Sequence, residues 1–212
     1  MQELIIGSVP LLIALIISFE RYKKLEPRWL RLFAWFLLGT FIIQTSGYYY
    51  SHIFKKSNHF IFNFYTFYDY GFYIFIFYKT LKRKALKKVI LFIGLFFILL
   101  YIYQIFILNQ FFIYSSFTSN AGEFLTLCCC FLYLAELLMA DEMIDFFTIP
   151  MFWITTGIMI AAIGDFLYLC FFDYILKNNL DPDGSVYGVI TVLLSIIQYI
   201  FFTVGFVCKK YA

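Results

Sequence analysis

Residues 147–173 read FTIPMFWITTGIMIAAIGDFLYLCFFD, a long apolar run that carries one acid in its interior, Asp165, between Gly164 and Phe166. A helix needs about 20 mainly apolar residues to cross the hydrocarbon core of a bilayer. This run is long enough. The sequence therefore predicts a membrane-spanning helix with a carboxyl group inside it.

The composition of the whole chain agrees with this interpretation. Hydrophobic residues make up 63% and charged residues 14% of the 212 residues, against about 45–50% and 25% in soluble domains. A soluble domain of this size could not bury so much apolar surface. Seven segments are predicted to span the membrane, at about 3–20, 29–53, 59–79, 88–108, 121–140, 147–173 and 187–208. Short connections join them, so we expect one all-α transmembrane domain over residues 1–212, a seven-helix bundle.

Lysine and arginine gather on one side of these predicted spans. Thirteen of the 16 lie in the first and third connections and at the C-terminus, and three lie on the opposite side. Cytoplasmic loops carry an excess of Lys and Arg. We therefore expect a multi-pass protein of the cell inner (cytoplasmic) membrane, with its N-terminus outside and its C-terminus in the cytoplasm. The net charge of +3 does not indicate a nucleic-acid partner.

Polar residues inside the predicted spans are the candidates for function. A charge at the centre of a span costs about 2.5–3.5 kcal/mol, so such groups normally face other helices or a cavity. Asp69 shares one helical face with Phe62, Tyr65, Thr66 and Tyr73, which forms either an interhelical polar cluster or a ligand or proton site. The candidates for lining a polar cavity are Gln44, Asn63, Asp69, Tyr73, Glu123, Asp165 and Gln198. An aromatic belt at the membrane interface is the alternative for the tyrosines near the outer end.

A stripe of small residues lies beside Asp165. Gly157, Ala161 and Gly164 recur at helical spacing, which predicts close packing against a neighbouring helix. Asp165 borders this stripe and is expected either to cap the neighbouring helix or to face a cavity. The spacing slightly favours the helix.

Motifs of known chemistry do not occur in the sequence. HExxH, GxSxG, a P-loop and GxGxxG are absent, and the five cysteines lack CxxC spacing. We therefore predict no metal site and no cofactor. The segment NNLDPDG matches the opening of a calcium loop, but Ile190 stands where a bidentate Glu is needed, which favours a simple turn.

The stretch GIMIAAIGDFLYL, residues 157–169, resembles the glycine-and-aspartate helix of lysoplasmalogenase-type membrane hydrolases. The resemblance covers about one span and implies a membrane-embedded hydrolase that uses Asp165. The second acidic helix of that family has no recognisable counterpart in this chain.

The missing motifs and the short loops favour a non-enzymatic function. We expect a small bacterial-type inner-membrane sensor or accessory subunit that acts through helix contacts with a membrane protein partner or a second copy of the chain. The alternative is an intramembrane lipid-directed hydrolase or a small proton-coupled transporter, with Asp69 and Asp165 as the acid–base groups.

Overall fold

The computed structural model describes residues 2–108, 111–113, 116–139, 145–181 and 185–208. Within these ranges all regular secondary structure is helical, which confirms the all-α prediction. The long helices are α1 (Gln2–Glu20), α2 (Leu32–Phe54), α3 (His59–Thr80), α4 (Lys84–Ile102), α5 (Ser116–Leu138), α6 (Pro150–Cys170) and α8 (Ser185–Val207). Each overlaps one of the seven segments predicted from hydropathy. Short helical turns, η1 (Tyr22–Lys24), η2 (Arg28–Arg31) and η4 (Phe146–Thr148), precede α2 and α6.

Several helices differ at their ends from the predicted segments, and α5 begins five residues early, at Ser116. The fourth continues beyond α4 into a π-helical turn, η3 (Tyr103–Ile107). The sixth begins later and breaks earlier than expected, because Pro150 starts α6 and a short separate helix, α7 (Phe172–Lys177), follows it. Proline suits a first helical turn, where its missing N–H leaves no hydrogen bond unmade.

Among the described residues, five helices are long and apolar enough to cross a membrane, as expected of a helical membrane protein. They cover Arg28–Phe54, Lys84–Ile107, Phe117–Leu138, Pro150–Cys170 and Ser185–Val207. Helix α3 is long enough but more polar, because Asn63, Asp69 and its tyrosines lie along it. The side chains of α1 are described from Ser8 onward, so this helix is represented by a shorter apolar stretch, Ser8–Glu20.

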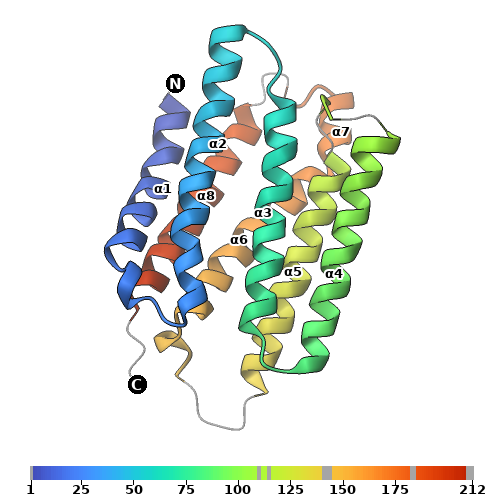
Figure 1. The fold of residues 1–212 in the computed structure, drawn as a ribbon. Coiled ribbons are helices and arrows are strands. Elements are labelled where there is room, and N and C mark those ends of the chain that lie inside the picture. The colour runs from blue at the N-terminus through green and yellow to red at the C-terminus, as the bar shows by residue number, and fades with distance from the viewer. Residues whose placement is uncertain (1, 109–110, 114–115, 140–144, 182–184, 209–212) are drawn as a thin grey trace.

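Six helices form a closed ring. Around it α1 contacts α2, α2 contacts α3, α3 contacts α5, α5 contacts α6, α6 contacts α8, and α8 returns to α1. Helix α4 lies outside the ring against α3 and α5 (Figure 1). We call the end of the bundle where α2 stops and α3 begins, at the top of Figure 1, the α2–α3 end, and the opposite one the α3–α4 end.

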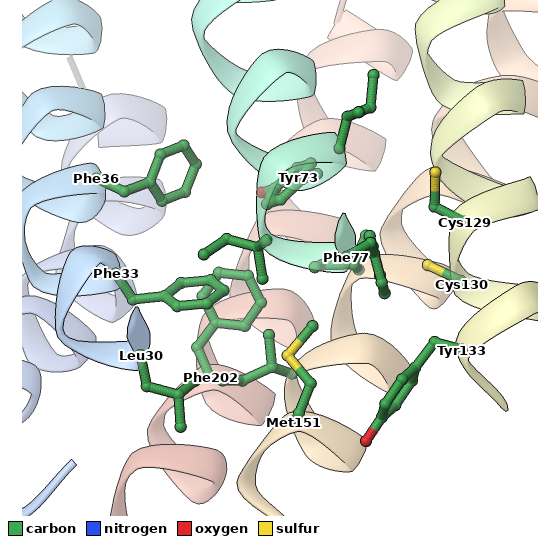
Figure 2. Packing of buried hydrophobic residues seen from close by; sticks show 14 of the residues in the cluster. Leu30, Phe33, Phe36, Tyr73, Phe77, Cys129, Cys130, Tyr133, Met151 and Phe202 are labelled. Atoms are coloured by element: carbon green, nitrogen blue, oxygen red, sulfur yellow. The ribbon is translucent and has the colours of Figure 1, made fainter. Parts of the chain in front are cut away.

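Aromatic and aliphatic side chains fill the ring toward the α3–α4 end. Phe33, Phe77 and Phe202 are completely buried there, and Figure 2 shows them packed together with Met151. The rings of Phe33 and Phe202 meet edge to face with centroids 5.6 Å apart, a favourable aromatic geometry. The described side chains therefore close this half of the bundle with a dry apolar core.

Glu136 fixes the α3–α4 end of the bundle. From the last turns of α5 its carboxylate accepts the backbone N–H of Lys82 at 2.9 Å and of Arg83 at 2.6 Å, just before α4 begins. The guanidinium of Arg83 donates to the carbonyl oxygen of Met139 at 3.2 Å. Glu136 thus links α5 to the α3–α4 connection. Asp141 and Glu142, the acids of the fifth connection, lie outside the described residues.

Candidate functional site

A cavity of about 830 Å³ occupies the other half of the ring. It reaches from residues at the α2–α3 end, such as Tyr48, His59 and Tyr187, to Thr126 and Ile158 near the middle of the bundle. Its volume lies within the range of small-molecule sites, about 300–1,000 Å³. Polar side chains on its wall come from five helices: Gln44, Tyr48, His59, Tyr65, Thr66, Asp69, Tyr70, Tyr73, Ser119, Glu123, Thr126, Asp165, Tyr187, Thr191, Ser195, Gln198 and Tyr199.

Helix α3 presents Asp69 to the cavity with its predicted companions. Phe62, Tyr65, Thr66 and Tyr73 all line the same wall, as the helical period requires. The Tyr65 hydroxyl donates to Oδ1 of Asp69 over 3.4 Å, which is a long hydrogen bond. Asp69 is therefore oriented by its own helix and turned toward the interior.

Helix α8 meets α3 across the cavity through an amide. Nε2 of Gln198 donates to the Tyr73 hydroxyl at 2.8 Å. Tyr73 is 5% exposed, so this bond is sheltered from solvent and lipid. The Gln198–Tyr73 hydrogen bond lies at the inner end of the cavity, next to the apolar core.

Helix α5 contributes the second carboxyl group, Glu123. The Tyr70 hydroxyl donates to its Oε1 at 2.6 Å, which is a short hydrogen bond. Gly122 makes this contact possible, because a Cβ at that position would overlap the Tyr70 ring. The sequence singled out Glu123 but gave no sign of Tyr70 as its partner.

Helix α6 contributes the third carboxyl group, Asp165, for which the sequence left two alternatives open, a helix cap and a cavity. We favoured a carboxyl that caps a neighbouring helix, whereas Asp165 lines the cavity and its Oδ1 is buried without a hydrogen-bond partner. The small-residue stripe does pack closely against α8. A Cβ on Gly157 would lie 2.7 Å from Cβ of Phe201, and one on Gly164 would lie 2.6 Å from a Leu194 methyl. The stripe and the acid thus occupy neighbouring faces of α6.

The three carboxyl groups share one space. Asp69, Glu123 and Asp165 all line the cavity. Among the described residues no Lys or Arg lines it, and His59 is the basic side chain on its wall. The same part of the chain contains no group of three His, Cys, Asp or Glu arranged to hold a metal ion. The cavity therefore concentrates acid groups without a fixed counter-ion from the described side chains.

Thr126 is a further cavity residue, one that the sequence analysis missed. It lines the cavity and is 1% exposed, and its Oγ1 is buried without a hydrogen-bond partner. A buried hydroxyl left without a partner costs about 1–3 kcal/mol. The spacing of Ser119, Glu123 and Thr126 on one face of α5 was the available signal.

Six of the seven predicted polar candidates line the cavity, namely Gln44, Asp69, Tyr73, Glu123, Asp165 and Gln198. The seventh, Asn63, instead holds the segment between α4 and α5. Its amide donates to the carbonyl oxygens of Phe111 at 2.7 Å and Ile113 at 3.0 Å. Asn63 thereby positions Ile113, which does line the cavity. That any of these residues binds a ligand remains a prediction.

The connection from α7 to α8 lies beside the cavity mouth, and Asp181 organises it. Its carboxylate accepts the backbone N–H of Val186 at 3.1 Å and of Tyr187 at 3.0 Å, and the Tyr168 hydroxyl at 3.1 Å. These N–H donors hold the pKa of Asp181 below its ordinary value of 3.8. The carboxylate of Asp181 therefore caps the first turn of α8, a position where a negative charge is favourable. Asp183, the other acid of the calcium-like segment, lies outside the described residues.

The resemblance to a known family gives no further information about the function of this cavity. The likeness of residues 157–169 to a lysoplasmalogenase helix is confined to one element, so the function has to be argued from the cavity itself. Comparisons with protein-family models, curated proteins and solved structures gave no match to this chain.

Proposed function

We propose that this protein is an intramembrane hydrolase that acts on an amphiphilic, lipid-like substrate. The observation that carries the proposal is a cavity of about 830 Å³ whose wall combines three carboxyl groups with aromatic and aliphatic side chains. An apolar bundle needs no such cavity for packing. Carboxyl groups near a bound substrate are the usual acids and bases of hydrolysis.

The surroundings of the carboxyl groups suggest their roles. Asp165 lines the cavity, and we assign it the role of the base that accepts a proton from an attacking water. Asp69 is oriented by Tyr65 and is the candidate to return a proton to the leaving group. Water then adds across the broken bond, one product keeping the hydroxyl and the other the proton. Ile158, Leu169 and Val192 supply apolar wall for a hydrocarbon segment.

The proposal includes a topology. The seven long helices cross the cytoplasmic membrane, with the N-terminus outside, in agreement with the distribution of Lys and Arg along the sequence. The α2–α3 end then faces outward, so the substrate reaches the cavity from the outer side. The apolar core at the α3–α4 end separates the cavity from the cytoplasmic side. This arrangement favours a hydrolase over a transporter, because a transporter would need a path through the whole bundle.

A lipid panel tests the hydrolase. Purified protein in an uncharged maltoside detergent is incubated with single-chain and double-chain glycerolipids carrying neutral, anionic or ammonium head groups, and products are followed by mass spectrometry. We expect turnover of at least one lipid, lost in Asp165→Asn and strongly reduced in Asp69→Asn, because each removes an acid–base group. Asp145→Asn is the matched control, since Asp145 lies outside the cavity and caps η4 through the N–H of Phe147.

The alternatives make different predictions for the same experiment. If no lipid is consumed, or if Asp165→Asn turns over lipid as fast as the unmodified protein, the hydrolase proposal fails. Binding of a lipid without turnover would favour the sensor or accessory subunit predicted from the sequence. That function, acting through a membrane protein partner or a second copy, remains a prediction.

A further inference from the structure

The charge of the cavity wall limits what can occupy it. Asp69, Glu123 and Asp165 all face the interior, and no Lys or Arg of the described chain lines it. In this low-dielectric setting an anionic group, such as a phosphate, would be repelled by any ionised carboxyl. A cationic group would instead supply the missing counter-charge.

The aromatic residues narrow the class of cation. Rings of Phe62, Tyr65, Tyr70, Tyr73 and Tyr199 line the same cavity as the carboxyl groups. Aromatic faces attract organic ammonium groups within about 6 Å of the ring centroid, and aromatic walls with acids are a recurrent way to bind quaternary ammonium ligands. A small metal ion fits less well, because no metal-holding cluster occurs among the described residues.

Two of the residues that line the cavity also carry buried oxygens without a hydrogen-bond partner. They are Oγ1 of Thr126, on a residue that is 1% exposed, and Oδ1 of Asp165. Surrounding atoms cover both oxygens, so a bound cation would meet the other carboxyl oxygens and the aromatic rings of the wall.

We propose that the cavity binds an organic ammonium group, held between the carboxyl groups of Asp69, Glu123 and Asp165 and the surrounding tyrosine rings. If the protein is the hydrolase proposed above, this group is part of the substrate and selects among lipids. The binding itself does not depend on turnover, so it can be tested separately.

Choline and its uncharged isostere, 3,3-dimethylbutan-1-ol, form a matched pair of probes. They share shape and hydroxyl group and differ in the charged nitrogen. Binding is measured by isothermal titration to the full chain in uncharged maltoside detergent. We expect saturable choline binding, at least about tenfold weaker binding of the isostere, and a comparable loss for choline in Asp165→Asn and Asp69→Asn. Asp145→Asn should bind choline like the unmodified protein, and size-exclusion profiles confirm that each variant is folded.

Three results would overturn the ammonium proposal. They are no choline binding at 50 mM ligand, equal binding of choline and its isostere, or unchanged choline binding in both cavity variants. The outcome is separable from that of the hydrolase test. Choline binding without lipid turnover supports the ammonium site and removes the hydrolase, whereas turnover restricted to neutral or anionic lipids does the reverse.

Discussion

Replacing Gly157 by alanine tests the close approach of α6 to α8 that shapes one wall of the cavity. A Cβ at position 157 would lie 2.7 Å from Cβ of Phe201 and 3.1 Å from the backbone oxygen of Gln198. Neither atom is the free end of a flexible side chain, so the two helices must move apart by a few tenths of an ångström. Gln198 moves with that backbone, and its bond to Tyr73 is strained as well.

The expected cost follows from two opposing effects. Overpacking a well-packed contact costs about 1–3 kcal/mol, while alanine in place of a helical glycine returns about 0.5–1 kcal/mol. With the middle of each range, the net loss is about 1.3 kcal/mol. At roughly 2–4 °C per kcal/mol for a chain of this size, the Tm of Gly157→Ala should fall by roughly 3–5 °C.

Thermal unfolding in detergent, followed by tryptophan fluorescence, measures this change, and the chain offers two comparison sites. A Cβ on Gly71 meets nothing within 4 Å, so Gly71→Ala should melt at the same temperature as the unmodified protein or slightly higher. A Cβ on Gly164 meets mainly the Leu194 methyl groups, which can rotate away, so Gly164→Ala should fall in between. Equal Tm values for the Gly157 and Gly71 variants would refute the described helix contact.

Two further predictions concern links outside the cavity. Glu136→Ala leaves the backbone N–H groups of Lys82 and Arg83 without their carboxylate acceptor. The free energy of unfolding, measured by denaturant titration, should therefore fall by about 0.5–2 kcal/mol, as it does when a helix cap is lost. An unchanged denaturation midpoint would contradict this role of Glu136. Asp181 has a lowered pKa because the N–H of Tyr187 and a second backbone donor bind its charged form. Its contribution to stability is therefore present above the unfolded-state pKa and lost as pH falls through the lower folded-state value. Between pH 5 and pH 3, the Tm of the unmodified protein should fall by this contribution, whereas the Tm of Asp181→Asn should not. If the Tm values of the two proteins change in parallel with pH, the role of Asp181 is contradicted.

Much of the fold follows from the sequence because hydropathy and helix length are local properties. The seven long helices overlap the seven predicted segments, and proline fixes the start of α6 at Pro150. What hydropathy could not give is which helices are neighbours. The closed ring with α4 outside depends on packing between side chains far apart in sequence, such as Tyr70 against Gly122.

Some residues of the candidate site could likewise be predicted from the sequence, and others could not. An acid inside an apolar segment is conspicuous in any sequence, so Asp69, Glu123 and Asp165 were identified from the sequence alone. Hydroxyl residues are ordinary in membrane helices, and Thr126 became notable only when its neighbours were known. Asp165 was placed against a helix because the stripe beside it indicated packing, but the helical rotation from Gly164 to Asp165 is about 100° and carries the carboxyl into the cavity.

The cavity itself is the strongest argument that these acids are functional. Small side chains face it from α6 and α8, among them Ala161, Ala162, Gly188 and Ser195. Larger apolar residues at such positions would fill the space, and removing void volume stabilises a protein by about 24 cal/mol per Å³. The cavity wall instead carries carboxyl groups, each of which is costly inside a membrane. A bundle that acted only through its outer surface would gain stability by filling this space with leucine, whereas one that binds a ligand between α3, α5, α6 and α8 requires the space.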